Sequence, residues 1–193
     1  MTELYYVTTN QGKLEEVSAF MQKHRPDIVI KSFAADILEI QSLDQQEVAI
    51  DKALKAWQLL KKPLLVDDAG MYFEKYHEFP GVMSKFISAA LGMAGLLKLV
   101  EDGDKAFFRL VMVYVDAEGK AYPFDGHCAG FIMHPKEFVA HKDLPYDDIF
   151  VPEELPVNER CSYSVLRQDL QKFAPYSYRL RALRSFLNWY NHK

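Results

Sequence analysis

The sequence has 193 residues, a hydrophobic content of 49% and a formal net charge of −4, and these values exclude several broad classes of protein. A chain of this length and apolar content buries a substantial core, so it is neither a disordered nor a fibrous protein. The negative charge argues against a general nucleic-acid binder, because such binding depends on phosphate neutralisation by Lys and Arg. We therefore expect no nucleic-acid partner, and any phosphate site to be a local basic pocket.

The cysteines and the apolar segments indicate a cytoplasmic protein with no membrane partner. Cys128 and Cys161 lack CxxC spacing in a chain too large to need disulfides, which favours a reducing compartment. Residues 1–10 lack the basic start and the apolar core of a signal peptide. The longest apolar stretch, residues 86–97, is shorter than the roughly 20 residues of a membrane helix. Because no linker or repeat is visible, we treat residues 1–193 as a single domain.

The first third of the chain alternates between strand and helix patterns. Residues 4–8 are aromatic and β-branched and predict a strand, and the apolar spacing that follows predicts a helix. Residues 28–33 predict a second strand. Residues 44–61 predict a longer helix, with an aspartate as N-cap and a stripe of alanines on one face. Residues 64–66 predict a short buried strand that stops where two aspartates follow.

The rest of the chain predicts further helices and a strand hairpin. Residues 80–100 predict a helical region that opens on Pro-Gly, and residues 107–115 and 121–127 predict an antiparallel hairpin around a turn. Apolar residues at helical spacing from Tyr176 onward predict a final amphipathic helix. The alternation of strands and helices, followed by a hairpin, predicts an α/β domain with a mixed sheet.

The segment Thr8-Thr9-Asn10-Gln11-Gly12-Lys13 joins the first strand to the first helix and is a candidate phosphate site. The N-terminus of a helix offers exposed N–H groups and the positive end of the helix dipole, and Lys13 adds a full charge. The segment is not a Walker A loop, because Leu14 follows the lysine and no upstream glycine has the required spacing. An ordinary turn with a solvated lysine is the alternative.

Asp67 and Asp68 place two adjacent carboxylates after a buried strand, where α/β proteins usually bind ligands. Adjacent residues of an extended strand point to opposite faces, so only one of the two is expected to face a site. Magnesium binds through one or two carboxylates and substrate phosphates, so Glu39 or Glu47 would complete a magnesium site. The alternative is a turn, which is the commoner setting for two adjacent aspartates.

Three further basic residues are candidates for polyphosphate binding. Lys52 and Lys55 lie one turn apart on the same predicted helix, away from its alanine stripe. Arg179, in the segment Ser177-Tyr178-Arg179 at the start of the last helix, is a planar donor that suits a phosphate or a base oxygen. Solvated lysines on a helix surface are the alternative for the first pair.

Taken together, these segments resemble the inosine triphosphate pyrophosphatase family, and the resemblance covers nearly the whole chain. Each motif is weak alone, but their shared order and spacing make the resemblance specific. The motifs are Thr9-Asn10, Gly12-Lys13-Leu14-Glu15-Glu16-Val17, Glu39-Ile40-Gln41, the helix with Lys52 and Lys55, Asp67-Asp68-Ala69-Gly70, Phe79-Pro80-Gly81-Val82, Gly126 and Gly130, Tyr146-Asp147 with Phe150, and Ser177-Tyr178-Arg179 with Arg181-Ala182-Leu183.

The resemblance implies a fold, a reaction and a set of site residues. The fold would be a two-lobed α/β domain around an elongated mixed β-sheet with flanking helices and a central active-site cleft, usually as a homodimer. The reaction would be Mg²⁺-dependent hydrolysis of inosine, deoxyinosine and xanthosine triphosphates to the monophosphate and pyrophosphate. Glu39 and Asp68 would hold the metal, and Asp68 and Lys13 would be catalytic. The implied substrate-binding residues are Thr9, Asn10, Lys13, Lys52, Lys55, Tyr146, Asp147, Ser177, Tyr178 and Arg179.

The sequence departs from the family in the segments that hold the base. Leu144, Pro145, Asp148 and Tyr178 stand where the family has Phe, Gly, Pro and His. Loss of the Phe removes a stacking platform, and loss of the His removes a donor for the 6-oxo group, although Arg179 is still expected to donate to a keto oxygen. Two alternatives therefore stay open. One is the same chemistry on another nucleobase, and the other is an inactive nucleotide-binding protein.

Overall fold

The computed structural model describes residues 1–77, 79–135, 144 and 146–193. The chain divides into two compact units. Unit 1 consists of Met1–Asp68, Leu110–Gly126 and Arg179–Lys193, and unit 2 consists of Ala69–Arg109 and His127–Tyr178. The interpretation of residues 1–193 as a single domain stays a prediction.

The strands of the described residues form one mixed sheet in the order β2-β1-β3-β5-β6-β7, in which β4 also pairs with β3. Strand β1 runs parallel to β2 and β3, whereas β4 and β7 pair antiparallel with β3 and β6. The predicted α/β fold with a mixed sheet is thereby confirmed. The strands are β1 (Thr2–Val7), β2 (Ile28–Phe33), β3 (Leu64–Phe73), β4 (Phe79–Gly81), β5 (Lys105–Val115), β6 (Ala121–Ile132) and β7 (Phe150–Pro152).

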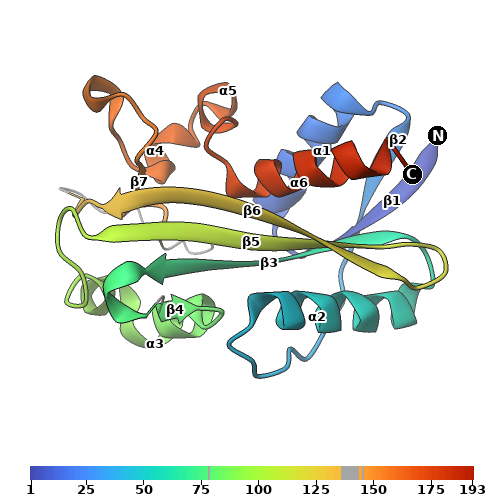
Figure 1. The fold of residues 1–193 in the computed structure, drawn as a ribbon, viewed down its shortest axis with the longest axis horizontal. Helices are drawn as coiled ribbons and strands as arrows, with labels where there is room; N and C mark the ends of the chain where they lie inside the picture. Colours follow the sequence, from blue (N-terminus) through green and yellow to red (C-terminus); the bar gives the residue numbers. More distant parts are fainter. Residues whose placement is uncertain (78, 136–143, 145) are drawn as a thin grey trace. The chain divides into compact units, whose positions relative to one another are not determined.

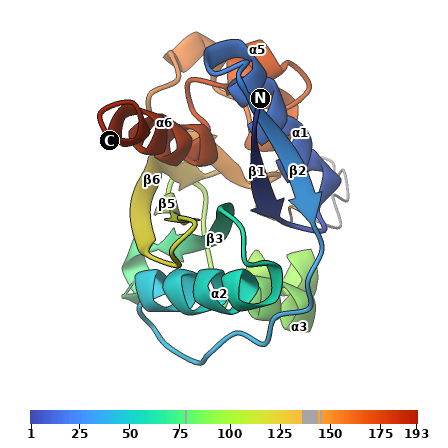
Figure 2. The same cartoon turned by 90° about the vertical axis from the view of Figure 1, so that its right-hand side faces the viewer.

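The helices of unit 1 lie on both faces of its part of the sheet. Helices α1 and α6 cover one face and α2 covers the other (Figure 1 and Figure 2). The helices are α1 (Gln11–His24), α2 (Gln45–Leu60), α3 (Ser84–Leu96), α4 (Tyr163–Leu166), α5 (Leu170–Phe173) and α6 (Tyr178–Tyr190), with 3₁₀ turns at Glu74–Tyr76 and Val157–Glu159. Within the described part of the chain, no helix combines the length and the hydropathy needed to cross a membrane.

Helix α2 shows why the periodic parts of the sequence were predictable. The side chain of Asp44 accepts from the backbone N–H of Gln46 and caps the helix, as expected for an N-cap aspartate. The alanine stripe, Ala49, Ala53 and Ala56, is fully buried against the aliphatic side chains of β3 and β5. Small side chains let the helix lie close to the sheet, so this stripe fixes which face of β3 lies against α2.

Strand β3 is longer than the sequence predicted, and the expectation that it stops at Asp67 is wrong. The run Asp67-Asp68-Ala69-Gly70 consists of weak strand formers, but β3 lies between β1 and β5, and pairing on both sides overrides local propensity. Gly70 permits this arrangement, because a Cβ there would lie 2.4 Å from the carbonyl oxygen of Gly81 on β4. The two carboxylates therefore lie inside a strand and not in a turn.

Two other boundaries differ from the sequence prediction. Residues 80 and 81, expected to open a helical region, lie in β4, and α3 begins only at Ser84 and ends at Leu96. The final helix begins at Tyr178, two residues later than the apolar spacing suggested. The first helix, the helix at 44–61, the second strand and the hairpin are confirmed, with β6 extending to Ile132.

Candidate functional site in unit 1

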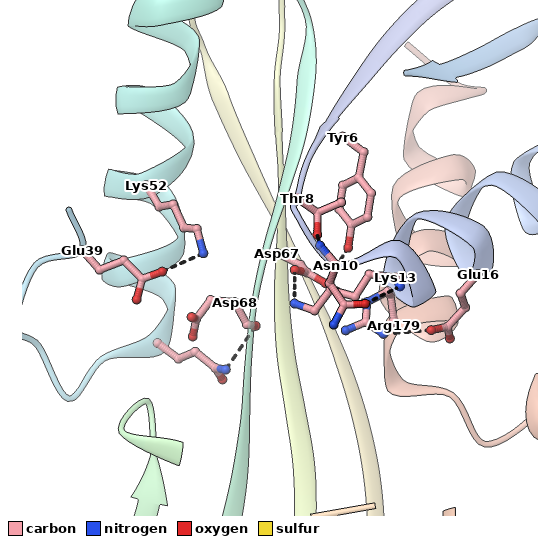
Figure 3. Close-up of polar contacts among 11 residues, drawn as sticks. Tyr6, Thr8, Asn10, Lys13, Glu16, Glu39, Lys52, Asp67, Asp68 and Arg179 are labelled. Carbon is pink, nitrogen blue, oxygen red and sulfur yellow. Dashed lines mark hydrogen bonds and ion pairs between the residues drawn. The ribbon is translucent and has the colours of Figure 1, made fainter. Parts of the chain in front are cut away.

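The candidate site is organised around Asp67 and Asp68, which point to opposite faces of β3 (Figure 3). Leu64 and Val66 pack in the core against α2, and the side-chain period of a strand places Asp68 on that same face. Asp67 lies on the other face, toward α1 and α6. The expectation from the sequence that the two carboxylates point to opposite faces of the strand is confirmed. Each carboxylate has its own set of neighbours.

Asp67 is the centre of a buried set of polar contacts that we call the Asp67 cluster, made of Tyr6, Lys13, Glu16, Asp67 and Arg179. The Lys13 Nζ donates to Asp67 Oδ1 at 2.8 Å. The Tyr6 hydroxyl and the Arg179 Nε both donate to Asp67 Oδ2 at 2.7 Å. The Arg179 Nη1 donates to Glu16 Oε2 at 2.8 Å. Lys13 and Arg179 are thus ion partners of Asp67, not of Asp68.

The electrostatics of the Asp67 cluster keep its carboxylate ionised. Burial by itself would raise the pKa of Asp67, but the charges and hydrogen bonds of Lys13 and Arg179 outweigh it and hold that pKa well below its usual range. The pKa of Lys13 is lowered, chiefly by burial and partly by the charge of Arg179, while Asp67 opposes the shift. Two cations and two carboxylates therefore balance one another in the cluster.

The segment before α1 holds Lys13 in place through local hydrogen bonds. The Asn10 side chain caps the helix, because its Oδ1 accepts from the backbone N–H of Lys13 at 3.0 Å. The backbone N–H of Asn10 donates in turn to Thr8 Oγ1 at 3.1 Å. Thr9 is exposed. The side-chain oxygen of Asn10 is therefore committed to the helix, and Thr9 faces solvent in the predicted phosphate segment.

Asp68 lies among a second set of residues on the α2 face, which we call the Asp68 group: Glu39, Gln45, Lys52 and Asp68. The Lys52 Nζ donates to Glu39 Oε1 at 2.7 Å, and the Gln45 Nε2 donates to the backbone oxygen of Asp68 at 3.2 Å. Within the described residues, the buried Oδ2 of Asp68 has no hydrogen-bond partner. Burial raises the pKa of Asp68 to about 6, although Lys52 and Gln45 act in the opposite direction.

Two other residues considered in the sequence analysis, Lys55 and Glu47, contact α2 and the segment before it. The Lys55 Nζ donates to the carbonyl oxygen of Leu38 at 2.8 Å and pairs with Asp51 at 2.7 Å. Glu47, the alternative metal ligand, accepts from the hydroxyl of Ser42 at 2.8 Å. In this structure both side chains fasten the segment before α2 to the helix.

The residues of the two sets influence one another electrostatically across β3. Burial lowers the pKa of Lys13, and the charge of Lys52 lowers it further. Burial also lowers the pKa of Lys52, but Glu39, Asp67 and Asp68 together raise it above its usual value. The two lysines and the carboxylates beside them therefore form one connected arrangement of charge.

The Asp68 group offers oxygens that fit a hard divalent cation. The buried Asp68 Oδ2 lacks a partner in the described chain, and Glu39 is close enough to raise the pKa of Asp68. Mg²⁺ usually takes one or two carboxylates from a protein, since phosphates and waters complete its coordination shell. No group of three or more His, Cys, Asp or Glu suited to a metal occurs in the described ranges. The donor set fits magnesium shared with a phosphorylated substrate.

The residues predicted for the base end lie in unit 2, except for Arg179. Tyr146 is buried, and its hydroxyl donates to the carbonyl oxygen of Ser84 at 2.9 Å. Asp147 is buried and accepts from the Nε of Arg167. Both side chains therefore have partners inside unit 2.

Ser177 and Tyr178 are also buried in unit 2. The ring of Tyr178 stacks on Phe108 with centroids 4.7 Å apart, as part of an aromatic core that also includes Tyr163. Among the departures from the family pattern, Leu144 is half-buried and Asp148 is buried, whereas Pro145 lies outside the described residues. The role of these residues in base binding stays a prediction.

Several residues of the site were missed by the sequence analysis. Glu16 carried a signal, because it follows Lys13 by three positions and lies beside Val17 on the apolar face of α1, where a charged residue needs a partner. Gln45 and Tyr6 carried none, since their roles depend on which strands and helices meet. Asp67 was noticed only as the neighbour of Asp68.

Comparisons with known proteins match nearly the whole length of the chain. The model of the Ham1 family matches residues 4–189. The dITP/XTP pyrophosphatase of Hyperthermus butylicus is 31% identical over 186 residues, covering 94% of this chain and 91% of the relative. That of Pyrococcus horikoshii is 30% identical over 192 residues, covering 97% and 96%. A HAM1 protein from Coxiella burnetii, 24% identical, has the same fold over 100% of both chains with a TM-score of 0.74.

Proposed function

This chain belongs to the Ham1 family, and we propose that it hydrolyses non-canonical purine nucleoside triphosphates, such as those of inosine, deoxyinosine and xanthosine, to the monophosphate and pyrophosphate. The names of relatives that are similar over nearly their full length support this reaction. The observation that carries it is Asp68, a carboxylate beside Glu39 and Lys52 whose buried Oδ2 has no hydrogen-bond partner among the residues that the structure describes. A buried carboxylate oxygen that lacks a protein partner is suited to bind a metal ion or a water molecule that takes part in a reaction.

The basic residues supply charge to the triphosphate in this proposal. Lys13 lies on the Asp67 face of β3 and pairs with Asp67. Lys52 lies on the Asp68 face and pairs with Glu39. A lysine ammonium is a mobile point charge that exchanges a carboxylate partner for a phosphate oxygen. The other predicted contacts, Thr9, Asn10, Lys55, Tyr146, Asp147, Ser177 and Tyr178, stay predictions.

Asp68 is the proposed base for an attacking water. With a pKa of about 6 it is ionised near neutral pH and basic enough to accept a proton. The water oxygen forms a bond to the α-phosphorus, and the bond from that phosphorus to the bridging oxygen breaks. Pyrophosphate leaves with the bridging oxygen, and the water proton passes to Asp68. Positioning and charge stabilisation by the lysines lower the barrier.

Magnesium belongs to the proposal as the cofactor of the Asp68 group. Glu39 and Asp68 would hold it, directly or through water, and when bound it supplies positive charge to the phosphate oxygens. A cytoplasmic homodimer is also part of the proposal. The location is supported by the free thiols of Cys128 and Cys161, and the dimer by the resemblance to the family.

The test is pyrophosphate release by the purified protein with magnesium, across inosine, xanthosine, guanosine, adenosine and pyrimidine triphosphates. The matched variants are Asp68→Asn and, as a control, Asp36→Asn, which changes an exposed aspartate of unit 1. We expect preference for inosine and xanthosine triphosphates, and a loss of about 100-fold or more in kcat for Asp68→Asn alone.

Other outcomes separate the remaining candidates. Preference for a different base would keep the chemistry and replace the substrate, in line with the departures at Leu144 and Tyr178. Nucleotide binding without release of pyrophosphate from any substrate would overturn the enzyme proposal in favour of an inactive nucleotide-binding protein.

A further inference from the structure

We propose that the ion pair between Glu39 and Lys52 makes the site select a triphosphate that carries a divalent cation over the same triphosphate without metal. In this structure the two side chains bind each other, so Lys52 has to leave Glu39 before its full charge is available to a phosphate. This inference rests on the proposed function, which assigns Glu39 to the cation and Lys52 to the triphosphate. It adds a control of access to that site.

The Glu39–Lys52 pair lies on the same side of β3 as Asp68 (Figure 3). The Lys52 Nζ donates to Glu39 Oε1 at 2.7 Å, which is the distance of a charge-assisted hydrogen bond. The side chain of Lys52 is 22% exposed and that of Glu39 is 37% exposed. The pair is therefore fully formed, and both of its members are within reach of a ligand that enters from solvent.

The segment that carries Glu39 is held to α2 by contacts other than this ion pair. On one side of Glu39, the carbonyl oxygen of Leu38 accepts from the Lys55 Nζ at 2.8 Å. On the other side, the hydroxyl of Ser42 donates to Glu47 at 2.8 Å. Loss of the ion pair therefore needs only changes of side-chain conformation, and the anchored backbone stays in place.

Charge balance explains why a divalent cation separates the pair. Glu39 and Asp68 together balance the charge of such a cation, and the cation repels the Lys52 ammonium from the carboxylate that they would share. A triphosphate that arrives with the cation then supplies the anion that Lys52 has lost. A triphosphate without metal meets the opposite situation, because it has to displace Glu39 from Lys52 and is repelled by both carboxylates.

In the alternative, Lys52 is available to phosphate at all times and Glu39 is only a weak surface partner. The two cases differ in how substitutions of the two residues combine. If the ion pair controls access, removal of Lys52 matters little for metal-free phosphate while Glu39 is present, and matters once Glu39 is gone. If Lys52 is always available, its removal has the same effect with and without Glu39.

The probe for this difference is inorganic tripolyphosphate in the presence of EDTA. It carries neither a base nor a metal, so its binding does not depend on turnover. Calorimetry measures its affinity for the wild-type protein, Glu39→Gln, Lys52→Met and the double variant. Glu47→Gln is the matched control, because it replaces another exposed carboxylate of unit 1 by its amide, and Glu47 accepts from a serine hydroxyl instead of a lysine.

We expect Glu39→Gln to strengthen the binding of tripolyphosphate about threefold, because Lys52 is released. Lys52→Met should weaken binding about threefold in the Glu39→Gln background and by less than about 1.5-fold in the wild-type background. The control should change the affinity by less than about 1.5-fold. Equal effects of Lys52→Met in both backgrounds would overturn the inference, and so would the absence of a gain in Glu39→Gln.

A second readout uses Mg²⁺ alone, without nucleotide. If Lys52 competes with the cation for Glu39, Lys52→Met should bind Mg²⁺ about threefold more tightly than the wild-type protein. Lys52→Arg keeps the positive charge and still pairs with a carboxylate, so it should show no gain. Equal Mg²⁺ affinity in Lys52→Met and the wild-type protein would contradict the competition. If no nucleotide releases pyrophosphate, the proposed function fails while both binding experiments still test the ion pair.

Discussion

Asp67 and Asp68 occupy consecutive positions of β3, and their surroundings are opposite. Asp67 accepts from three donors on three elements. Burial would raise its pKa, but the charges and hydrogen bonds of Lys13 and Arg179 outweigh burial and hold that pKa well below the usual range. Asp68 has a buried oxygen with no partner in the described chain, and burial raises its pKa to about 6. The same chemical group is thus stabilised as an anion on one face of the strand and destabilised on the other.

The difference shows how one strand carries a carboxylate that stabilises the fold beside a carboxylate that is available to a ligand. A carboxylate whose lone pairs are used by fixed donors stabilises the fold and has little capacity left for a ligand. A carboxylate that is buried without enough partners costs stability and gains reactivity, because a metal or a proton lowers its energy. The side-chain alternation of β3 keeps the two kinds of site one residue apart without mixing their neighbours.

The largest effect on stability is expected from Asp67→Asn, which tests the supporting role of Asp67. Loss of the shared anion leaves Lys13 and Arg179 with too little negative charge, so we expect the free energy of unfolding at pH 7 to fall by about 3 to 5 kcal/mol. Because the folded pKa of Asp67 is depressed, its contribution exists above the unfolded pKa and is lost as pH falls through the folded value. Urea unfolding of both proteins measures the difference. A neutral substitution would contradict the supporting role of Asp67.

Magnesium provides the second test. If Glu39 and Asp68 hold the cation, magnesium at a hundred times its dissociation constant stabilises the wild-type protein by about 2.7 kcal/mol. We expect Asp68→Asn to lose most of this stabilisation and Asp36→Asn to keep it, as measured by the rise of Tm with magnesium concentration and no nucleotide. Equal stabilisation of all three proteins would place the metal elsewhere.

Asp68→Asn without any divalent cation gives the third and most direct contrast. A folded pKa of about 6 lies above the unfolded value, so the ionised carboxylate destabilises the fold once pH rises through that range. We therefore expect the substitution to raise the free energy of unfolding at pH 8 by about 2 kcal/mol, and this gain to vanish below the unfolded pKa. Unfolding curves at the two ends of the pH range decide it, and a loss of stability at pH 8 would refute the contrast.

The smallest effect is expected from Tyr6→Phe. The hydroxyl of Tyr6 is one of three donors to Asp67, and the two cations remain after its removal. We expect a loss of about 1.5 kcal/mol, clearly less than for Asp67→Asn, with the same urea assay. A loss as large as that of Asp67→Asn would mean that the hydroxyl, and not the ion pairs, dominates the cluster.

The sequence was sufficient for those parts of the fold that depend on periodicity. The alanine stripe of α2 with its Asp44 cap, the first helix and the hairpin all follow from side-chain spacing and local capping. The continuation of β3 through Asp68 could not be predicted in this way, because it depends on pairing with β1 and β5 and not on local propensity. Tertiary pairing overrode the turn-like composition of that segment.

For the candidate site, the residue types were visible in the sequence but their partners were not. The alternation of side chains along a strand indicated that Asp67 and Asp68 would point to opposite faces. It could not indicate that Lys13 and Arg179 would lie with the first of them, because that depends on which face α1 and α6 cover. Glu16 shows the same limit, since its burial was foreseeable from the apolar face of α1, whereas its partner comes from the other end of the chain.

The Asp67 cluster also links the site to the order in which the chain is synthesised. Arg179 follows Asp67 by 112 residues and Glu16 by 163. During synthesis both carboxylates and Lys13 leave the ribosome long before Arg179, so the Asp67 cluster lacks its second cation until the last helix emerges. Closing such distant contacts is slow compared with local helix formation. A chain that stops before Arg179 would have to bury two carboxylates with Lys13 as the one cation left in the cluster, and we expect it to remain partly unfolded and sensitive to proteases.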